Sequence, residues 1–207
     1  MKIATFLLVG SIILTGCSSS TNSVSAGTGR FLCIPDSHAV TIPLSGGSDS
    51  GFDPEGGGYG TSILIQAEEV VRLIPGFKAE IGVGSNVRYQ SLYVMLSPRS
   101  EVERDSLILP AVQTLEESES LARVESDAFN WPVVEQTESG PIHWGSCADR
   151  FTRPESFTCM RDLLVGDLVM TYPIHQQNLH LYMDIDSMLM DKVKEWRCPS
   201  GKISIER

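Results

Sequence analysis

The sequence predicts an α+β fold: a mainly antiparallel sheet with one amphipathic C-terminal helix, stabilised by disulfides. Three observations support this prediction. Short apolar segments are separated by Gly, Pro and Ser, a helical apolar stripe lies near the C-terminus, and four cysteines follow the first 17 residues. The chain has 207 residues, 42% of them hydrophobic, which is enough apolar area for a core. A single folded domain is expected over residues 30–207.

The first 16 residues have the pattern of an export signal. Lys2 supplies a positive charge, and the apolar run after it has 12 residues, fewer than the roughly 20 of a membrane span. The run ends in Leu14-Thr15-Gly16-Cys17, which resembles the lipobox of bacterial lipoproteins. The resemblance implies cleavage after residue 16, lipidation of Cys17 and anchoring to a membrane through the acyl chains. The alternative is an ordinary secretory signal in which the Cys occurs by chance.

The segment after the signal is rich in Ser, Thr and Gly, and residues 17–29 are predicted to form a lipidated, flexible tether. Ser18 and Ser19 follow the Cys, with no Asp beside it. In Gram-negative lipoproteins an Asp at this place resembles a retention signal for the inner membrane. We therefore expect a periplasmic protein anchored to the inner leaflet of the outer membrane.

Strands are expected along most of the domain. In the first half they are residues 38–44, 61–67, 78–83 and 88–96, where β-branched and aromatic residues gather between turn signals. In the second half, residues 129–135 are expected to form a strand interrupted by Pro132, and residues 157–164 and 167–172 a hairpin joined near Gly166. Residues 113–124 are rich in helix formers and acids, and are expected to form a short surface helix.

Residues 184–197 carry the strongest helix pattern in the chain. Five apolar residues fall on one stripe: Ile185, Met188, Leu189, Val193 and Trp196. An Asp at the start and basic residues toward the end suit the helix dipole, and a Pro and a Gly follow.

Four cysteines remain after Cys17, and in an oxidising compartment an even number predicts two disulfides. Three pairings are possible. We favour Cys147–Cys159, which closes a short loop, with Cys33–Cys198, which joins the two ends of the domain. The spacing contains no CxxC and no His at ligand distance from a Cys pair, so a metal site is not expected.

The sequence does not predict an enzyme. It contains no GxSxG nucleophile motif, no nucleotide-binding glycine motif and no HExxH motif. The run 48–51 has the residue types of a protease nucleophile loop, but its Gly content is better explained by loop flexibility. His143 is the most site-like of the four His residues, and a hydrogen-bonded strand residue is the simpler interpretation. We expect no catalytic residue and no cofactor.

The charge of the chain limits its partners. It has 16 basic and 26 acidic residues, a formal net charge of −10, and loss of residues 1–16 would leave 15 basic residues and a charge of −11. Nucleic acid is not expected as a partner, because phosphate binding needs clustered Lys and Arg. A basic protein partner is compatible with this charge. The acidic candidates for partner binding lie in the Gly-rich loop 45–60 and in the run 116–119; they are Asp49, Asp53, Glu55, Glu116, Glu117 and Glu119.

Short pieces of the sequence, together with the lipobox and the four cysteines, resemble a known family. They are GRFLCIP at residues 29–35, IPGF at 74–77, YP at 172–173 and EWRC at 195–198. They resemble the small periplasmic immunity lipoproteins that protect bacteria from type VI secretion effectors, especially lipase-type effectors. The resemblance implies a protein that binds and neutralises a cognate effector, a phospholipase, by protein–protein contact.

Two other functions share these sequence features. An envelope structural or assembly lipoprotein would bind a different partner protein, and a secreted hydrolase is the third, least supported class. No interface residue can be carried over from the immunity family, because such interfaces vary with the toxin.

Overall fold

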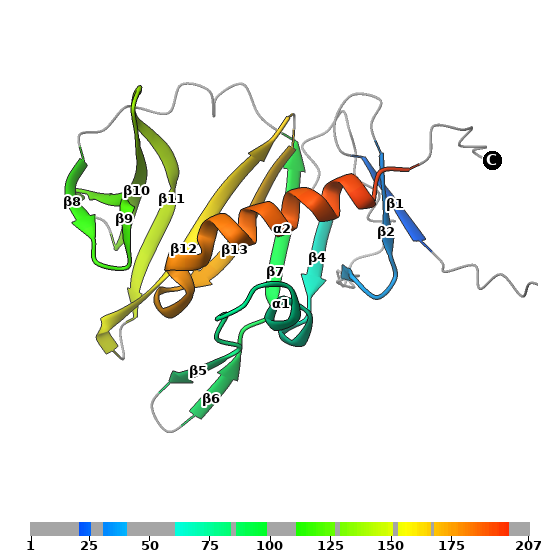
Figure 1. The fold of residues 1–207 in the computed structure, drawn as a ribbon, viewed down its shortest axis with the longest axis horizontal. Coiled ribbons are helices and arrows are strands. Elements are labelled where there is room, and N and C mark those ends of the chain that lie inside the picture. Colours follow the sequence, from blue (N-terminus) through cyan, green and yellow to red (C-terminus); the bar gives the residue numbers. More distant parts are fainter. Residues whose placement is uncertain are drawn as a thin grey trace, which may run out of the picture.

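The structure is a computed structural model that describes residues 21–25, 31–40, 61–83, 86–98, 111–126, 129–150, 153–166 and 168–198. Its centre is an antiparallel sheet, with nine strands among these residues in the order β3-β4-β7-β13-β12-β11-β10-β9-β8 (Figure 1). The strands are β3 (Ala39–Val40), β4 (Thr61–Ile65), β7 (Leu92–Pro98), β8 (Ala111–Leu115), β9 (Ser118–Val124), β10 (Asn130–Thr137), β11 (Gly140–Arg150), β12 (Arg153–Val165) and β13 (Leu168–His175).

The remaining elements surround this sheet. Two separate hairpin sheets pair β1 (Thr21–Ser25) with β2 (Phe31–Pro35), and β5 (Glu80–Val83) with β6 (Asn86–Tyr89). The helices are α1 (Ala67–Leu73), the 3-10 helix η2 (Gln176–Leu181) and α2 (Tyr182–Glu195). No helix in the described part of the chain has the length and hydropathy needed to cross a membrane.

Helix α2 runs diagonally across one face of the sheet (Figure 1). All five residues of the predicted apolar stripe are buried, and they share one core cluster with the inward side chains of the central strands. Burying such a side chain contributes about 1.5–3 kcal/mol, so packing against the sheet, more than intrinsic propensity, holds this helix in place. The predicted α+β fold with a C-terminal helix is confirmed, and the helix begins two residues earlier than predicted.

Two disulfides are present, in the pairing favoured from the sequence. Cys147 and Cys159 lie opposite each other on β11 and β12. Cys33–Cys198 spans 165 residues of sequence and ties β2 to the segment that follows α2. Beside it the Cys33 backbone N–H donates to the Trp196 carbonyl at 2.6 Å, so this end of α2 is fixed by a covalent bond and a hydrogen bond together.

The expected helix at 113–124 is wrong, because these residues form parts of the antiparallel strands β8 and β9. In β9, Leu121, Ala122 and Val124 are buried, and the strand also pairs with β10. The helix-forming Glu and Ser residues give only a weak local preference, and pairing on both sides of β9 overrides it.

Smaller differences concern boundaries. Residues 21–25, inside the predicted tether, form β1, whose Thr and Val suit a strand and which pairs along its length with β2. The expected strand 88–96 is divided between β6 and β7, and residue 67 begins α1 instead of ending a strand. The hairpin of β12 and β13 turns at Gly166 as predicted; its φ of 65° is one that glycine adopts without strain. Residues 1–20 and 41–60 lie outside the described residues.

Candidate functional site

A cleft of about 390 Å³ lies between α2 and the end of α1. Its apolar lining comes from the turn after α1 and from the middle of α2. Ile74 and Met188 are buried there, whereas Leu73 and Pro75 are exposed. Helix α1 reaches this position because Ala67, Val70 and Ile74 are buried on one side of it, which turns Leu73 outward.

The polar lining of the cleft is mainly acidic. Asp184, Asp191 and Glu195 line it from α2, and all three are exposed. The one basic residue in the lining, Lys192, places its Nζ 2.9 Å from Glu69 Oε1 and 3.6 Å from Glu195 Oε2. Three carboxylates and one ammonium give the cleft a negative potential, which attracts cationic groups of a partner.

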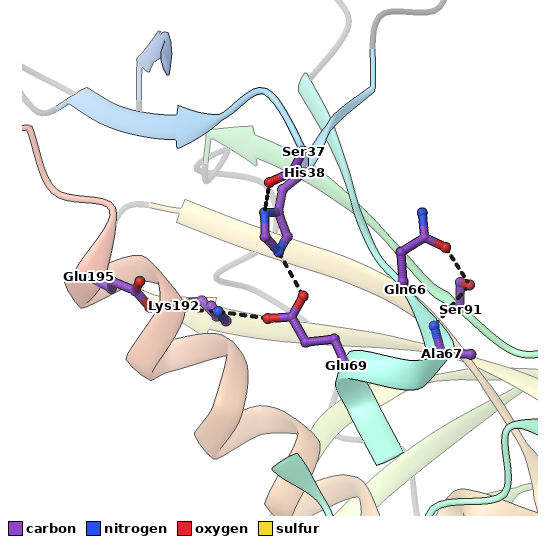
Figure 2. Close-up of polar contacts among 8 residues, drawn as sticks. All are labelled: Ser37, His38, Gln66, Ala67, Glu69, Ser91, Lys192 and Glu195. Carbon is purple, nitrogen blue, oxygen red and sulfur yellow. Dashed lines mark hydrogen bonds and ion pairs between the residues drawn. The ribbon is translucent and has the colours of Figure 1, made fainter. Parts of the chain in front are cut away.

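Three residues from separate elements form a polar chain behind the cleft, which we call the bridging network: His38, Glu69 and Lys192 (Figure 2). His38 Nε2 lies 2.9 Å from Glu69 Oε2, and Lys192 donates to the other carboxylate oxygen. An ionised carboxylate only accepts, so Nε2 carries the proton; in the neutral ring Nδ1 then accepts from the Ser37 hydroxyl at 3.0 Å. The side chains of His38, Glu69 and Lys192 are 14–17% exposed.

The bridging network holds Glu69 in its charged form. Burial by itself raises the pKa of Glu69, but the hydrogen bonds from Lys192 and His38 outweigh it, so the pKa lies below the ordinary value of 4.5. The network therefore joins the residue before β3, helix α1 and helix α2 by charge-assisted contacts. The Trp196 ring packs beside it, 5.2 Å from His38 and 5.7 Å from the Lys192 ammonium.

The contacts of Ser37, His38 and Glu69 differ from those of a catalytic triad. In a Ser-His-acid triad the serine contacts Nε2 and the carboxylate contacts Nδ1, whereas here the two are exchanged. The carboxylate is also shared with Lys192. We assign the network a positioning role: it fixes α1 against α2 and so sets the walls of the cleft. The N-terminus of α1 is held separately, because the Ala67 N–H donates to Ser91 Oγ at 3.2 Å (Figure 2).

The β5–β6 hairpin continues the chain from the cleft and projects away from the main sheet (Figure 1). One side of it is anchored by the buried Ile81. Its other side presents Val87 and Tyr89, which are 59% and 66% exposed, opposite Gly82 and Glu80. With Val71 and Leu73 of α1, four of the nine large exposed apolar residues in the described chain lie in one stretch of sequence, residues 71–89.

Asn178 of η2 fastens the base of this hairpin. The residue is fully buried, and its Oδ1 accepts from the Lys78 N–H at 2.8 Å. Its Nδ2 donates to the Lys78 carbonyl at 3.0 Å and to Gln90 Oε1 at 2.9 Å. One side chain thus binds the chain just before β5 and just after β6, which fixes the base of the hairpin.

A second polar cluster, the buried network, lies between α2 and the sheet. Arg161 on β12 donates to Asp186 Oδ2 from Nη2 at 2.9 Å and from Nε at 3.2 Å, and to the Trp144 carbonyl. Tyr172 donates to the other Asp186 oxygen at 2.7 Å. Burial, with the Asp186 carboxylate beside it, raises the pKa of Tyr172 well above 10.0, so the phenol stays protonated and keeps donating.

Glu116, Glu117 and Glu119, the predicted partner-binding acids that the structure describes, do not line the cleft. Glu116 and Glu117 lie at the turn between the edge strand β8 and its neighbour β9, and Glu119 is the second residue of β9. Glu117 accepts a short hydrogen bond from Gln176 Nε2, while Glu116 and Glu119 are exposed. Asp49, Asp53 and Glu55 lie outside the described residues, as does Cys17, so their roles remain predictions.

His143 lies on β11 with Nε2 3.3 Å from Asp162 Oδ2, as the interpretation of a hydrogen-bonded strand residue required. Burial by itself raises the pKa of Asp162. Hydrogen bonds from His143 and Thr171 lower it by more than burial raises it, so the pKa lies below its ordinary value. Among the described residues, no three His, Cys, Asp or Glu side chains are arranged to hold a metal ion.

Sequence reasoning missed helix α1 and therefore the cleft. A signal for α1 was present: Glu68 and Glu69 occupy its first turn and Arg72 its last, the charge order that a helix dipole favours. The segment has only seven residues, which is too short for helical periodicity to stand out against the strand before it. No local pattern could have paired His38 with Glu69, because the contact joins separate elements.

Comparison with known proteins gives little further information. No family model matches the chain, and no curated protein matches it. Among solved structures, an immunity protein of the Stenotrophomonas maltophilia type IV secretion system covers 87% of this chain and 94% of its own length, with 11% identity and a TM-score of 0.38. A likeness at this TM-score carries no inference about fold or function.

Proposed function

We propose that this protein is an envelope protein that binds and neutralises a secreted effector, as an immunity protein does. The observation that carries the proposal is the surface formed by the acidic cleft and the exposed apolar residues of α1 and the β5–β6 hairpin. Exposed apolar residues gathered in one part of a surface are typical of protein-binding sites. The sequence resemblance to immunity lipoproteins makes an effector the preferred partner.

The finer assignment rests on the sequence alone. The Leu14-Thr15-Gly16-Cys17 motif supports a lipid anchor on Cys17. Absence of an Asp after the Cys supports the periplasmic face of the outer membrane, and the sequence resemblance supports a type VI effector of phospholipase type. An inhibitor anchored on the periplasmic side would lie in the compartment from which such a phospholipase attacks the envelope, and could bind it there.

The experiment is protection of a bacterial host. Each gene that neighbours this one is tested as a candidate effector by expressing it with an export signal, together with the full-length chain or with its Cys17→Ala variant. Growth restored by the wild-type chain, together with co-purification of the two proteins, is the expected result. A periplasmic Cys17→Ala chain that still fractionates wholly with membranes contradicts lipidation, and a host that dies despite normal expression of the wild-type chain contradicts the immunity function.

A further inference from the structure

The cleft between α1 and α2 points to one kind of occupant. We propose that it receives a short segment of the partner protein in which an apolar side chain is flanked by Lys or Arg. This inference rests on the proposed function, since it names the chemistry by which the partner is bound. Val87 and Tyr89, the exposed apolar residues of the β5–β6 hairpin, do not line this cleft.

The apolar part of the inference follows from the lining of the cleft. A volume of about 390 Å³ is at the lower end of the range for small binding pockets, which suits a few side chains of a partner. Leu73 is 45% exposed at its edge, while Met188 and Ile74 are buried beneath. Covering the open part of Leu73 would remove apolar area from water, which favours an apolar side chain of the partner.

The charged part of the inference follows from the ion pairs of Lys192, the one basic residue in the lining of the cleft. Lys192 is 15% exposed at its side chain and is engaged by Glu69 and Glu195, so it offers little charge to a partner. Asp184 and Asp191 are exposed along the same side of α2. Asp191 also pairs with Lys194 Nζ at 2.8 Å, but its side chain is 71% exposed, so its carboxylate stays open to a partner. Carboxylates in this arrangement are complementary to Lys or Arg, and they would speed encounter with a cationic segment and repel an acidic one.

The inference is tested with a labelled peptide of about four helical turns that carries Leu at i, i+3, i+4 and i+7 spacing and Lys on the opposite side, so that it forms an amphipathic helix. Fluorescence anisotropy measures its binding to the chain as the cell produces it, held in mild detergent. The same peptide with Glu for each Lys is expected not to bind. The double variant Asp184→Asn, Asp191→Asn should weaken binding about fivefold or more, an effect that falls as salt is raised.

Two matched controls separate the cleft from the general acidity of the chain. Glu116→Gln with Glu119→Gln removes the same charge at the far edge of the sheet and should change binding less than twofold. Leu73→Asn should weaken binding about tenfold, whereas Leu164→Asn on β12 should not, although the two leucines are equally exposed at 45%. Thermal unfolding of each variant checks that the fold is kept.

Three results would overturn the inference: equal weakening by the charge control, equal binding of the Glu peptide, or no effect of Leu73→Asn. Self-association abolished by Leu73→Asn would assign the cleft to a second copy of this chain instead. The same variants are then placed in the protection experiment. If the wild-type chain protects and the cleft variants protect equally, the cleft is not the site but the immunity function stands; if the wild-type chain fails, that function itself is wrong.

Discussion

Two ion-paired networks hold α2, and they differ in what surrounds them. The buried network pairs Arg161 with Asp186 under the helix, where both residues are less than 10% exposed. The bridging network pairs Lys192 with Glu69 at the edge of the cleft, where the side chains are 15% and 17% exposed, against 10% for each side chain of the buried pair. Each is a Lys or Arg on a carboxylate at 2.9 Å, so distance alone does not distinguish them.

Burial decides what each network does. Removing one partner of a buried pair leaves the other charge without water or counter-ion, which costs about 3–5 kcal/mol. A pair near the surface recovers water when broken, and such pairs contribute about 0–1 kcal/mol. The buried network therefore fixes α2 on the sheet, whereas the bridging network adjusts how α1 sits against α2 with little effect on overall stability.

The largest effect is expected from Asp186→Ala. This change leaves the Arg161 guanidinium without its carboxylate and Tyr172 without its acceptor, and should lower the free energy of unfolding by about 3–5 kcal/mol. Asp191→Ala on the same helix is the control, because its pair with Lys194 is exposed, and it should cost less than about 1 kcal/mol. If urea denaturation shows that the two variants lose the same free energy of unfolding, burial does not determine how much each ion pair contributes to stability.

The buried, uncharged side chain of Asn178 allows a second test of whether burial decides the cost of removing a polar partner. Asn178→Leu removes three hydrogen bonds and leaves the Lys78 N–H and carbonyl without their partner, at a cost of about 2–3 kcal/mol. The loss should be local: amide hydrogen exchange should rise in the β5–β6 hairpin more than in β12 or β13. Gln177→Leu, at an exposed position, is the control. Unchanged exchange at the hairpin amides would remove Asn178 as its anchor.

The sequence predicted these regions unequally, for physical reasons. The hairpin at Gly166 and helix α2 rest on local signals, a turn residue and a period-3.6 stripe, which the tertiary structure reinforces. The disulfide pairing followed from loop lengths and the even count of cysteines. Strand β9 was missed because its partners, β8 and β10, decide its state more than its own Glu and Ser residues do.

The candidate site was predicted least well. Its residues come from α1, α2 and the turn before β3, and only the folded chain brings them together. Acidic residues were expected to bind the partner, and the candidates named, Glu116–Glu119 and the loop 45–60, are runs of like charge that are visible in a sequence; they stay predictions. Asp184, Asp191 and Glu195 are spaced along a helix, so they gather on one side only once the helix has formed.

A smaller effect is expected when the bridging network is titrated or altered. The pKa of Glu69 is lower in the folded chain than its ordinary 4.5, so its ionisation stabilises the fold above that pH, and this contribution is lost as the pH falls below 4.5 through the folded pKa. Glu69→Gln should cost about 1 kcal/mol at neutral pH, and this cost should decrease as the pH falls below 4.5. The measurement is thermal unfolding from pH 3 to 7, with exposed Glu68→Gln as the control. A Glu69→Gln deficit that stays constant across this range would contradict the charged role of Glu69.

The smallest effect on stability, yet a large one on partner binding, is expected at Gly82 on the β5–β6 hairpin. Gly82 is exposed and lies opposite Val87, and a Cβ built there meets nothing within 4 Å. Gly82→Lys should therefore change the free energy of unfolding by less than about 0.5 kcal/mol.

The Gly82→Lys variant places a charge beside Val87 and Tyr89. Its binding to the cognate effector should therefore weaken about tenfold if this side of the hairpin is covered in the complex. Gln136→Lys, at an exposed position of β10, adds the same charge away from the hairpin and should leave binding unchanged. An effector that binds the Gly82→Lys chain as tightly as the wild type would exclude this side of the hairpin from the interface, because a new charge beside Val87 and Tyr89 would then contact no part of the partner.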